Sequence, residues 1–99
     1  MINDLVLEWA ADRGILEVGT VDGQMNKLQE EFDELKDALQ RKHQVDVADA
    51  IGDMQVVLII LAEMKGLCAY ECLKGAYEII NQRKGTMANG VFVKDEDAA

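Results

Sequence analysis

Apolar residues recur along most of this chain at intervals of three and four, the spacing that places side chains on one face of an α-helix. The pattern is clearest in a segment that begins near Asp22 or Gln24 and ends near Gln40. Its apolar positions are Met25, Leu28, Phe32, Leu35 and Leu39. This spacing predicts an amphipathic helix whose apolar stripe is centred on Leu28, Phe32 and Leu39.

Two other segments carry helical patterns around this one. A first helix is expected over residues 3–13, with Asn3 as its cap, and its apolar side is formed by Leu5, Trp9 and Ala10. A third helix is expected over residues 45–65. From Met54 onward this third segment is apolar almost all round, which is typical of a central, buried helix.

The C-terminal third of the chain predicts a fourth helix and a tail. The helix covers residues 69–84 and is ended by Gly85, and its inward positions are Ala69, Leu73, Ala76, Tyr77 and Ile80. The tail contains an Asn-Gly turn, a three-residue apolar patch and a charged end. It is expected either as a short strand or as an arm on a partner subunit.

The connections and the length complete the fold prediction. Residues 17–24 carry two glycines and are expected to form a loop, and "RKHQ" at residues 41–44 is expected to link the second and third helices. The expected fold is all-α: a bundle of four helices with a short extended C-terminal tail, in one domain spanning residues 1–99. A chain of this length buries a modest core by itself, and the wide apolar surface of the last two helices predicts a homo-oligomer, a dimer or a tetramer.

The net charge of the chain excludes some classes of binding partner. A net charge of −9 argues against binding to nucleic-acid polymers or to anionic membranes, since both require clustered Lys and Arg. The N-terminus lacks the apolar core of a signal peptide, and the longest apolar run, residues 56–62, is too short to span a membrane. Cys68 and Cys72 are expected as reduced, semi-buried thiols. A cytoplasmic protein is expected, and its acidity is compatible with a bound divalent cation.

The second helix contains the stretch "KLQEEFDEL", in which four carboxylates occupy five positions. At about 100° per residue, Glu31 flanks the apolar stripe, Glu34 lies further round, and Glu30 lies beyond it. Lys27 projects into the same sector as Glu34, whereas Asp33 and Asp37 point mostly to water. By themselves these acids are consistent with a solvated helix face.

The third helix changes that interpretation. Asp46, Asp49 and Asp53 project from one side of the most apolar helix of the chain, where carboxylates without partners are costly. Capping and helix-dipole contacts account for Asp46 but not for Asp53, which lies two turns in. Two antiparallel helices would bring Glu30, Glu31 and Glu34 opposite Asp49 and Asp53. An all-oxygen ligand set of this kind suits Mg²⁺, with Mn²⁺ as a similar candidate, and through the metal a phosphorylated ligand.

These residues also carry a resemblance to a known family. "EEFDE" at residues 30–34 resembles the Glu-Glu-x-x-Glu motif of the all-α nucleoside triphosphate pyrophosphohydrolases, and the chain is most similar to their small MazG-like branch. The likeness runs nearly end to end, through Trp9 and "DRGI", "QMNKLQEEFDEL", "ADAIGDMQVVLIILA" and "ECLKGAYEIINQRKGTMANGVFVK". It implies a Mg²⁺-dependent enzyme that hydrolyses a nucleoside triphosphate to the monophosphate and pyrophosphate.

The resemblance also implies roles for particular acids. Glu30, Glu31 and Glu34 would be metal ligands or their immediate support, and Asp53 matches the aspartate of the second motif, Glu-x-x-Asp. Here the chain departs from the pattern, because Ala50 stands where that motif has its glutamate. Either Asp49 substitutes from the adjacent position, or the motif is formed by Asp46 and Asp49.

The remaining candidates concern catalysis and substrate. Glu30 or Glu34 would orient the attacking water or accept its proton. The expected substrate-binding residues are Lys27, Asn81, Arg83, Lys84 and Lys94. For Arg83 and Lys84, favourable placement at a helix C-terminus is an equally good explanation. Trp9 is expected in the core, with base stacking as the alternative.

Two other functions stay open. Phosphoribosyl-ATP pyrophosphohydrolase shares this fold, and we rank it second because the ending "RKGTMANGVFVK" resembles the MazG-like branch. From a different class, the chain could be an acidic helical interaction module without catalysis. Stabilisation by Mg²⁺ separates an enzyme from such a module.

Overall fold

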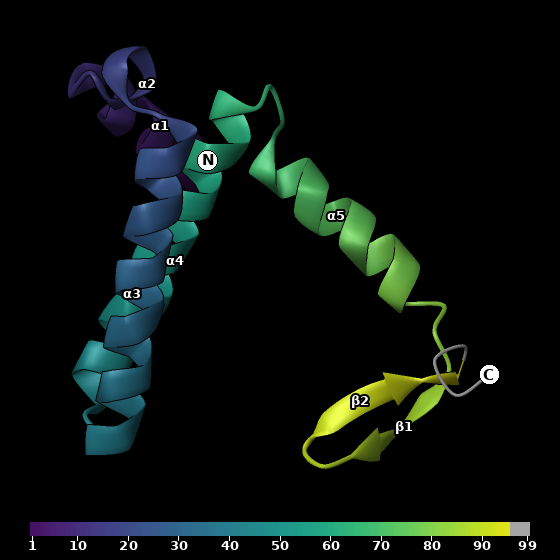
Figure 1. Cartoon of the computed structure of the whole chain (residues 1–99). Coiled ribbons are helices and arrows are strands. Elements are labelled where there is room, and N and C mark those ends of the chain that lie inside the picture. The colour runs from purple at the N-terminus through teal and green to yellow at the C-terminus, as the bar shows by residue number, and fades with distance from the viewer. Residues whose placement is uncertain (96–99) are drawn as a thin grey trace.

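The computed structural model describes residues 1–95, which form five helices and a two-stranded antiparallel sheet (Figure 1). In chain order the elements are α1 (Ile2–Asp12), α2 (Ile15–Val18), α3 (Val21–Arg41), α4 (Gln44–Met64), α5 (Ala69–Ile80), β1 (Gly85–Ala88) and β2 (Val91–Lys94). The mostly helical prediction is therefore confirmed, including all four long helices. The loop expected over residues 17–24 is wrong in part, because α2 and the start of α3 lie within it. The charged end expected for the chain falls partly on residues 96–99, which lie outside the described residues.

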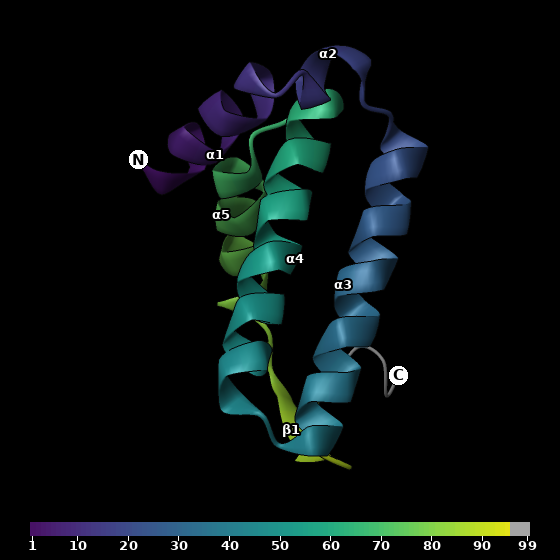
Figure 2. The ribbon, with the colours of Figure 1, turned by 90° about the vertical axis from the view of Figure 1, so that its left-hand side faces the viewer.

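Helices α3 and α4 form an antiparallel pair that lies side by side along its length (Figures 1 and 2). Helix α3 begins at the cap Thr20, whose hydroxyl accepts a hydrogen bond from the Gly23 amide at 2.9 Å. Lys42 adopts a left-handed conformation, φ 56°, and so ends α3 and turns the chain into α4. The small side chains of Ala38 and Ala50, both buried, allow the two helices to approach closely.

The buried stripe of α3 differs from the expected one. Glu31 and Ala38 are buried, whereas Phe32 and Leu39 are 44% and 57% exposed. Among the described elements the extensive contact of α3 is with α4, so the side of α3 that is covered is set mainly by this neighbour. The prediction centred the stripe on the largest apolar residues and placed Glu31 at its flank, but within this chain the acid lies inside the helix pair.

The C-terminal elements also depart from the prediction. Helix α5 ends at Ile80 rather than near residue 84, and none of its side chains is buried. Of its predicted inward positions, Ala69 is half-buried and the other four are exposed. Gly85 begins β1 instead of ending the helix. The Asn-Gly turn is confirmed: Asn89 and Gly90 take φ values of 52° and 83°, the left-handed pair that a tight hairpin needs.

The chain consequently has two parts. The body, residues 1–68, holds α1 to α4 and the buried residues, and the arm, residues 69–95, holds α5 and the hairpin. The arm leaves the end of α4, and the hairpin lies well away from α3 and α4 (Figure 1). The expected four-helix bundle does not form within one chain, because the fourth long helix does not pack on the other three.

Two smaller expectations concern membranes and thiols. Within residues 1–95, no helix combines the length and the apolarity needed to cross a membrane. Cys68 and Cys72 are free thiols, as expected, but both are exposed rather than semi-buried, because they lie where α5 begins to leave the body.

Candidate active site

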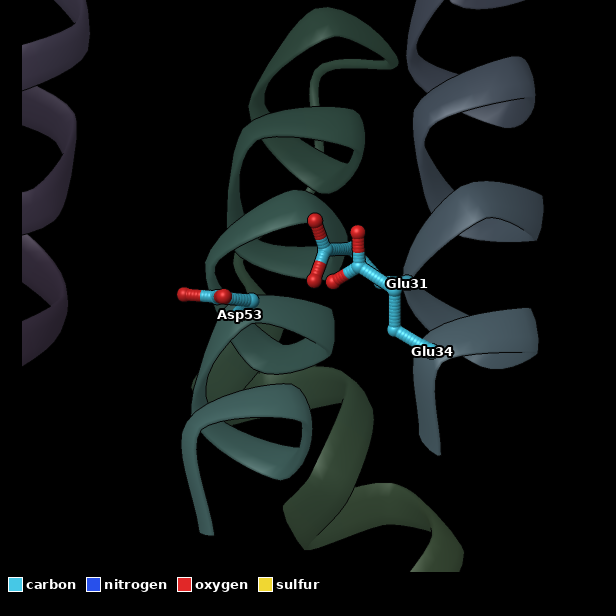
Figure 3. A group of neighbouring side chains, drawn as sticks. All are labelled: Glu31, Glu34 and Asp53. Carbon is cyan, nitrogen blue, oxygen red and sulfur yellow. The ribbon is translucent and has the colours of Figure 1, made fainter. Parts of the chain in front are cut away.

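Three carboxylates converge between the two long helices of the body. Glu31 and Glu34 reach from α3 toward α4, where Asp53 lies at the same height (Figure 3). One oxygen from each group lies within 4.8 Å of the others. The convergence follows from the sequence spacing: Glu31 and Glu34 are three apart on one helix face, and the antiparallel pairing places Asp53 opposite them.

Glu31 is the unusual member of the cluster. It is only 3% exposed, and its Oε2 atom has no hydrogen-bond partner. The other oxygen, Oε1, lies 3.3 Å from the Lys27 ammonium one turn earlier, and this contact is the main reason why the pKa of Lys27 is raised. A buried carboxylate oxygen without a partner is costly, so a functional reason for it is expected.

The pKa of Asp53 is also changed by its surroundings in this cluster of carboxylates. Loss of hydration around this carboxyl group raises its pKa, and the negative charge and hydrogen bonding of the neighbouring Glu31 raise the pKa further. Lys27 opposes the shift but does not cancel it. The three acids therefore repel one another when all are ionised, and a cation placed among them would relieve that repulsion.

The cluster opens into a cleft of about 570 Å³ between α3 and α4. Its acidic lining is formed by Asp33, Glu34, Asp37, Asp46, Asp49 and Asp53. Asp49 thus lies in the cleft but outside the tight cluster, as do Asp33 and Asp37, which were expected to point to water. Sequence reasoning missed Arg41, which also lines the cleft and pairs with Asp37 at 2.8 Å. The signal for it was present, because Asp37 and Arg41 are four apart on a helix.

Asp46 has a structural partner. Its Oδ2 atom accepts a hydrogen bond from the Arg41 guanidinium at 2.9 Å, and this contact lowers the pKa of Asp46. The Asp46 amide donates to Nδ1 of the cap residue His43 at 3.3 Å. These contacts join the end of α3 to the start of α4, so Asp46 serves the helix connection. Both candidates for the missing glutamate line the cleft, and of the two it is Asp46 that is engaged in the helix connection.

The other predicted site residues are divided between the body and the arm. Glu30 is exposed and pairs with Lys27 at 3.5 Å, outside the lining of the cleft. Lys27 is at the cluster. Four residues lie on the arm instead, away from the cleft: Asn81, Arg83, Lys84 and Lys94. Within a single chain these four are not brought to the acids.

Trp9 lies beside the acids rather than in the core. It is about half exposed and lines a hollow between α1 and α4 with Leu5, Val6, Val56 and Asp53. The Arg13 guanidinium covers the ring, 4.9 Å from its centroid. Asp53 therefore borders both the acidic cleft and an apolar hollow that contains an aromatic ring.

The chemical type of the possible ligand atoms determines which cofactor the cluster could bind. Glu31, Glu34 and Asp53 offer carboxylate oxygens only, and hard divalent cations such as Mg²⁺ prefer oxygen ligands. The unpartnered oxygen of Glu31 supplies a ligand atom that the protein itself does not satisfy. The residues present therefore fit a hard divalent cation.

Comparison with known proteins also matches this chain to a family of pyrophosphohydrolases. The model of the phosphoribosyl-ATP pyrophosphohydrolase family matches residues 19–90, a range that contains α3, α4 and most of the arm. A protein of Haemophilus phage HP1, described as an "Uncharacterized 18.2 kDa protein in rep-hol intergenic region", is 41% identical over 56 residues. That match covers 57% of this chain but 34% of the relative, so the chain spans about a third of the relative's length. No solved structure matches.

The family match covers well over half of the chain and includes every acid of the cluster. It agrees with the expected enzyme class, and at the level of the family it is the phosphoribosyl-ATP enzymes, ranked second from the sequence, that are matched. The chain belongs to the phosphoribosyl-ATP pyrophosphohydrolase family, within the MazG-like superfamily of all-α pyrophosphohydrolases.

Proposed function

We propose that this protein is a Mg²⁺-dependent pyrophosphohydrolase that cleaves a nucleoside triphosphate between its α and β phosphates, in the cytoplasm. The products are the nucleoside monophosphate and pyrophosphate. The observation that carries the proposal is the convergence of Glu31, Glu34 and Asp53 around a buried carboxylate oxygen that has no partner. A solvated acidic face, as in an interaction module, does not account for a carboxylate buried in this way.

The metal would be held by Glu31, Glu34 and Asp53, with Asp49 nearby in the cleft. When bound, a divalent cation neutralises charge on phosphate oxygens and lowers the pKa of water. Burial of Glu31 within the helix pair fixes its carboxylate in place. Mn²⁺ offers similar chemistry and is the natural substitute in an assay.

The chain's own groups supply proton transfer and charge. The oxygen of the attacking water bonds to the α-phosphorus, the bond from that phosphorus to the bridging oxygen breaks, and pyrophosphate leaves. Glu34, which is exposed within the cluster, is our candidate to accept the proton of that water. Glu30, the alternative base, is not among the residues that line the cleft. Lys27 and Arg41 are the cations of the body placed to offset charge on the phosphates.

Phosphoribosyl-ATP is the second candidate substrate, and the family match supports it equally. It is also a triphosphate, so the same acids and the same cleavage apply. The two substrates differ in the bulk attached to the base, which is the part that would lie furthest from the metal. The hollow beside Trp9 is an apolar surface that borders Asp53, and a base could lie on it.

One assay tests the reaction and separates these substrates. Pyrophosphate release should be measured for the eight common triphosphates and for phosphoribosyl-ATP, with Mg²⁺ and with excess chelator. In ¹⁸O-labelled water the label should appear on the monophosphate. Label on pyrophosphate would mean attack at the β-phosphorus, and release of free phosphate or the absence of any Mg²⁺-dependent turnover would equally contradict the proposal.

A further inference from the structure

The hollow between α1 and α4 has the size and the character of a site for a small ligand. Its volume is about 340 Å³. It is lined by Leu5, Val6 and Trp9 of α1 and by Asp53 and Val56 of α4. Sites for small ligands begin at about 300 Å³ and are mostly apolar, with a few polar groups at fixed places. The hollow fits this description, since four of these five residues are apolar.

Asp53 joins the hollow to the acidic cleft, because this residue belongs to the lining of both. Its side chain extends from α4 toward the side on which α1 lies (Figure 3). One of its oxygens is also within 4.8 Å of an oxygen of Glu31 and of Glu34. A cation held at the cluster would thus lie at the border of the hollow. A nucleotide whose phosphates approach that cation can therefore place its base beside Trp9.

The Trp9 ring is the flat aromatic surface of this hollow. The side chain is 44% exposed, so a ligand could cover much of it. The Arg13 guanidinium lies 4.9 Å from the ring centroid but is not among the residues that line the hollow. This cation–π contact supports the ring from outside the hollow and leaves the ring accessible from within it.

The hollow offers few hydrogen-bonding groups to the edge of a base. Among the described residues that line it, Asp53 alone has a polar side chain, and that carboxylate belongs to the acidic cluster. Backbone groups of α1 are bonded along the helix, as in the bond from the Arg13 amide to the Trp9 carbonyl at 3.2 Å. Such a surface binds a base through the area of its rings. Apolar pockets separate related ligands by about 10- to 200-fold, far less than sites that form hydrogen bonds.

We propose that Trp9 stacks on the base of the substrate and makes the site select purine over pyrimidine nucleotides, without distinguishing one purine from another. The two fused rings of a purine cover more of the indole than the single ring of a pyrimidine does. Phosphoribosyl-ATP carries adenine, so both candidate substrate classes contain purines. The inference rests on the proposed function, because its ligand is a nucleotide with its phosphates at the acids.

The first experiment uses the wild-type protein, in which Trp9 is the single tryptophan of the sequence. The α,β-methylene analogues of ATP, GTP, CTP and UTP resist cleavage between the α and β phosphates, and they are titrated with Mg²⁺ while indole fluorescence is recorded. Both purine analogues should quench the fluorescence and bind about tenfold more tightly than the pyrimidine analogues, or more. Binding that calorimetry detects without a change in fluorescence would overturn the proposal, as would tighter binding of the pyrimidines. Failure of all four analogues to bind would overturn it together with the proposed function.

Variants separate stacking from damage to the fold. Trp9→Ala should weaken binding of the ATP analogue by about 5- to 150-fold, the range supplied by stacking of one base on one aromatic ring. Trp9→Phe retains a ring and should recover most of this loss. Ile2→Ala is the matched control, because it removes apolar surface of α1 outside the lining of the hollow, and it should bind as wild type does.

Inorganic triphosphate is the control ligand, because it has the phosphates but no base. Calorimetry should give the same affinity for it in wild type and in Trp9→Ala. An equal loss for inorganic triphosphate and for the ATP analogue would show that the effect does not depend on a base, which contradicts stacking. Unchanged affinity of Trp9→Ala for the ATP analogue would contradict it as well.

Base binding and turnover can fail separately. Mg²⁺-dependent release of pyrophosphate with the same ratio of kcat/KM for purines and pyrimidines in wild type and in Trp9→Ala would overturn the role of Trp9 alone. Quenching by the purine analogues without turnover of any triphosphate would overturn the reaction alone.

Discussion

At the scale of single residues, the buried carboxylate of Glu31 makes the most specific prediction. Glu31→Gln keeps the shape of the side chain but removes one anionic ligand and one like charge from the cluster. Loss of even an outer partner of a metal ligand costs about 10–100-fold in affinity, so Mg²⁺ affinity should fall by at least that and turnover should collapse. Titration calorimetry and the pyrophosphate assay measure these two effects.

The metal-free form of Glu31→Gln should unfold at the same temperature as wild type or slightly higher, because one buried like-charge repulsion is gone. Glu17→Gln on α2, an exposed site outside the cleft lining, is the control and should change stability by no more than about 0.5 kcal/mol. Should Glu31→Gln behave like this control in activity and in Mg²⁺ binding, Glu31 does not belong to the site.

Asp53 predicts how the stability of the metal-free protein depends on pH. Because its pKa is raised in the folded state, the folded protein holds this proton over a pH range, above 3.8, in which the unfolded chain has lost it. The penalty for ionising Asp53 is thus absent below 3.8 and is fully present above the folded pKa, so this carboxyl group makes stability fall as pH rises through that window. Asp53→Asn should be more stable than wild type at pH 7 in chelator, and the difference should shrink on acidification toward pH 4. Thermal unfolding across this range measures it, and a constant difference would contradict it.

The residues of the site were predictable to the extent that helix geometry determines them. Spacings of three and four placed Glu31 and Glu34 on one face, and the short link at residues 41–44 placed Asp53 opposite. The burial of Glu31 was not predictable, because a hydrophobic stripe assigns the interior to the largest apolar residues. Two of the residues buried in the helix pair are Ala38 and Ala50, small residues that the pattern does not emphasise.

At the scale of the elements, the start of α3 provides a test of the local structure that positions the acids. Thr20→Ala removes the hydroxyl that accepts from the Gly23 amide and should cost about 1 kcal/mol of unfolding free energy. Thr20→Ser retains the oxygen and should restore most of that loss. Denaturant unfolding measures both variants, and equal stability for alanine and serine would show that the cap contributes nothing.

The boundaries of the elements were predicted well where a chemical signal stood at the helix end, and poorly at α5. The third helix was expected to end at residue 65, and α4 ends at Met64, with Gly66 in a left-handed conformation, φ 71°, just beyond it. At α5 the helical pattern continued to residue 84, but the chain leaves the helix after Ile80 and Gly85 begins a strand. A methyl group on Gly85 would lie 2.1 Å from the Val93 carbonyl oxygen, so the glycine is required by strand pairing rather than by the helix end. Single-residue signals do not distinguish these two uses of glycine.

At the scale of the whole molecule, metal binding should be visible as stability. A ligand that binds only the folded state at 100 times its dissociation constant adds about 2.7 kcal/mol to the free energy of unfolding. Mg²⁺ should therefore raise the melting temperature of wild type relative to chelator, and should do so much less for Glu31→Gln. Differential scanning fluorimetry checks this, and equal shifts for the two proteins would place the bound metal elsewhere.

The arrangement of the helices in space was the part that the sequence could not determine. The amphipathic stripe of α5 indicates only that one side is to be covered, and the covering surface can belong to the same chain or to another. Length and apolar content predicted an oligomer, but Gly66 in the turn at residues 65–68 marks only where α4 ends and not the direction in which α5 leaves the body.

The contact between Lys27 and Glu31 means that a positive charge already lies beside the carboxylates that a divalent cation would bind. The Lys27 ammonium lies 3.3 Å from Oε1 of Glu31, whereas Oε2 has no partner, so a divalent cation bound at Oε2 would be the second positive charge on the same carboxylate. Repulsion from the ammonium offsets part of the attraction of the acids for any cation, and the attraction that remains grows with the charge of the ion, which favours divalent over monovalent cations. The same ammonium would also reduce the repulsion between the acidic cluster and the phosphates of a substrate.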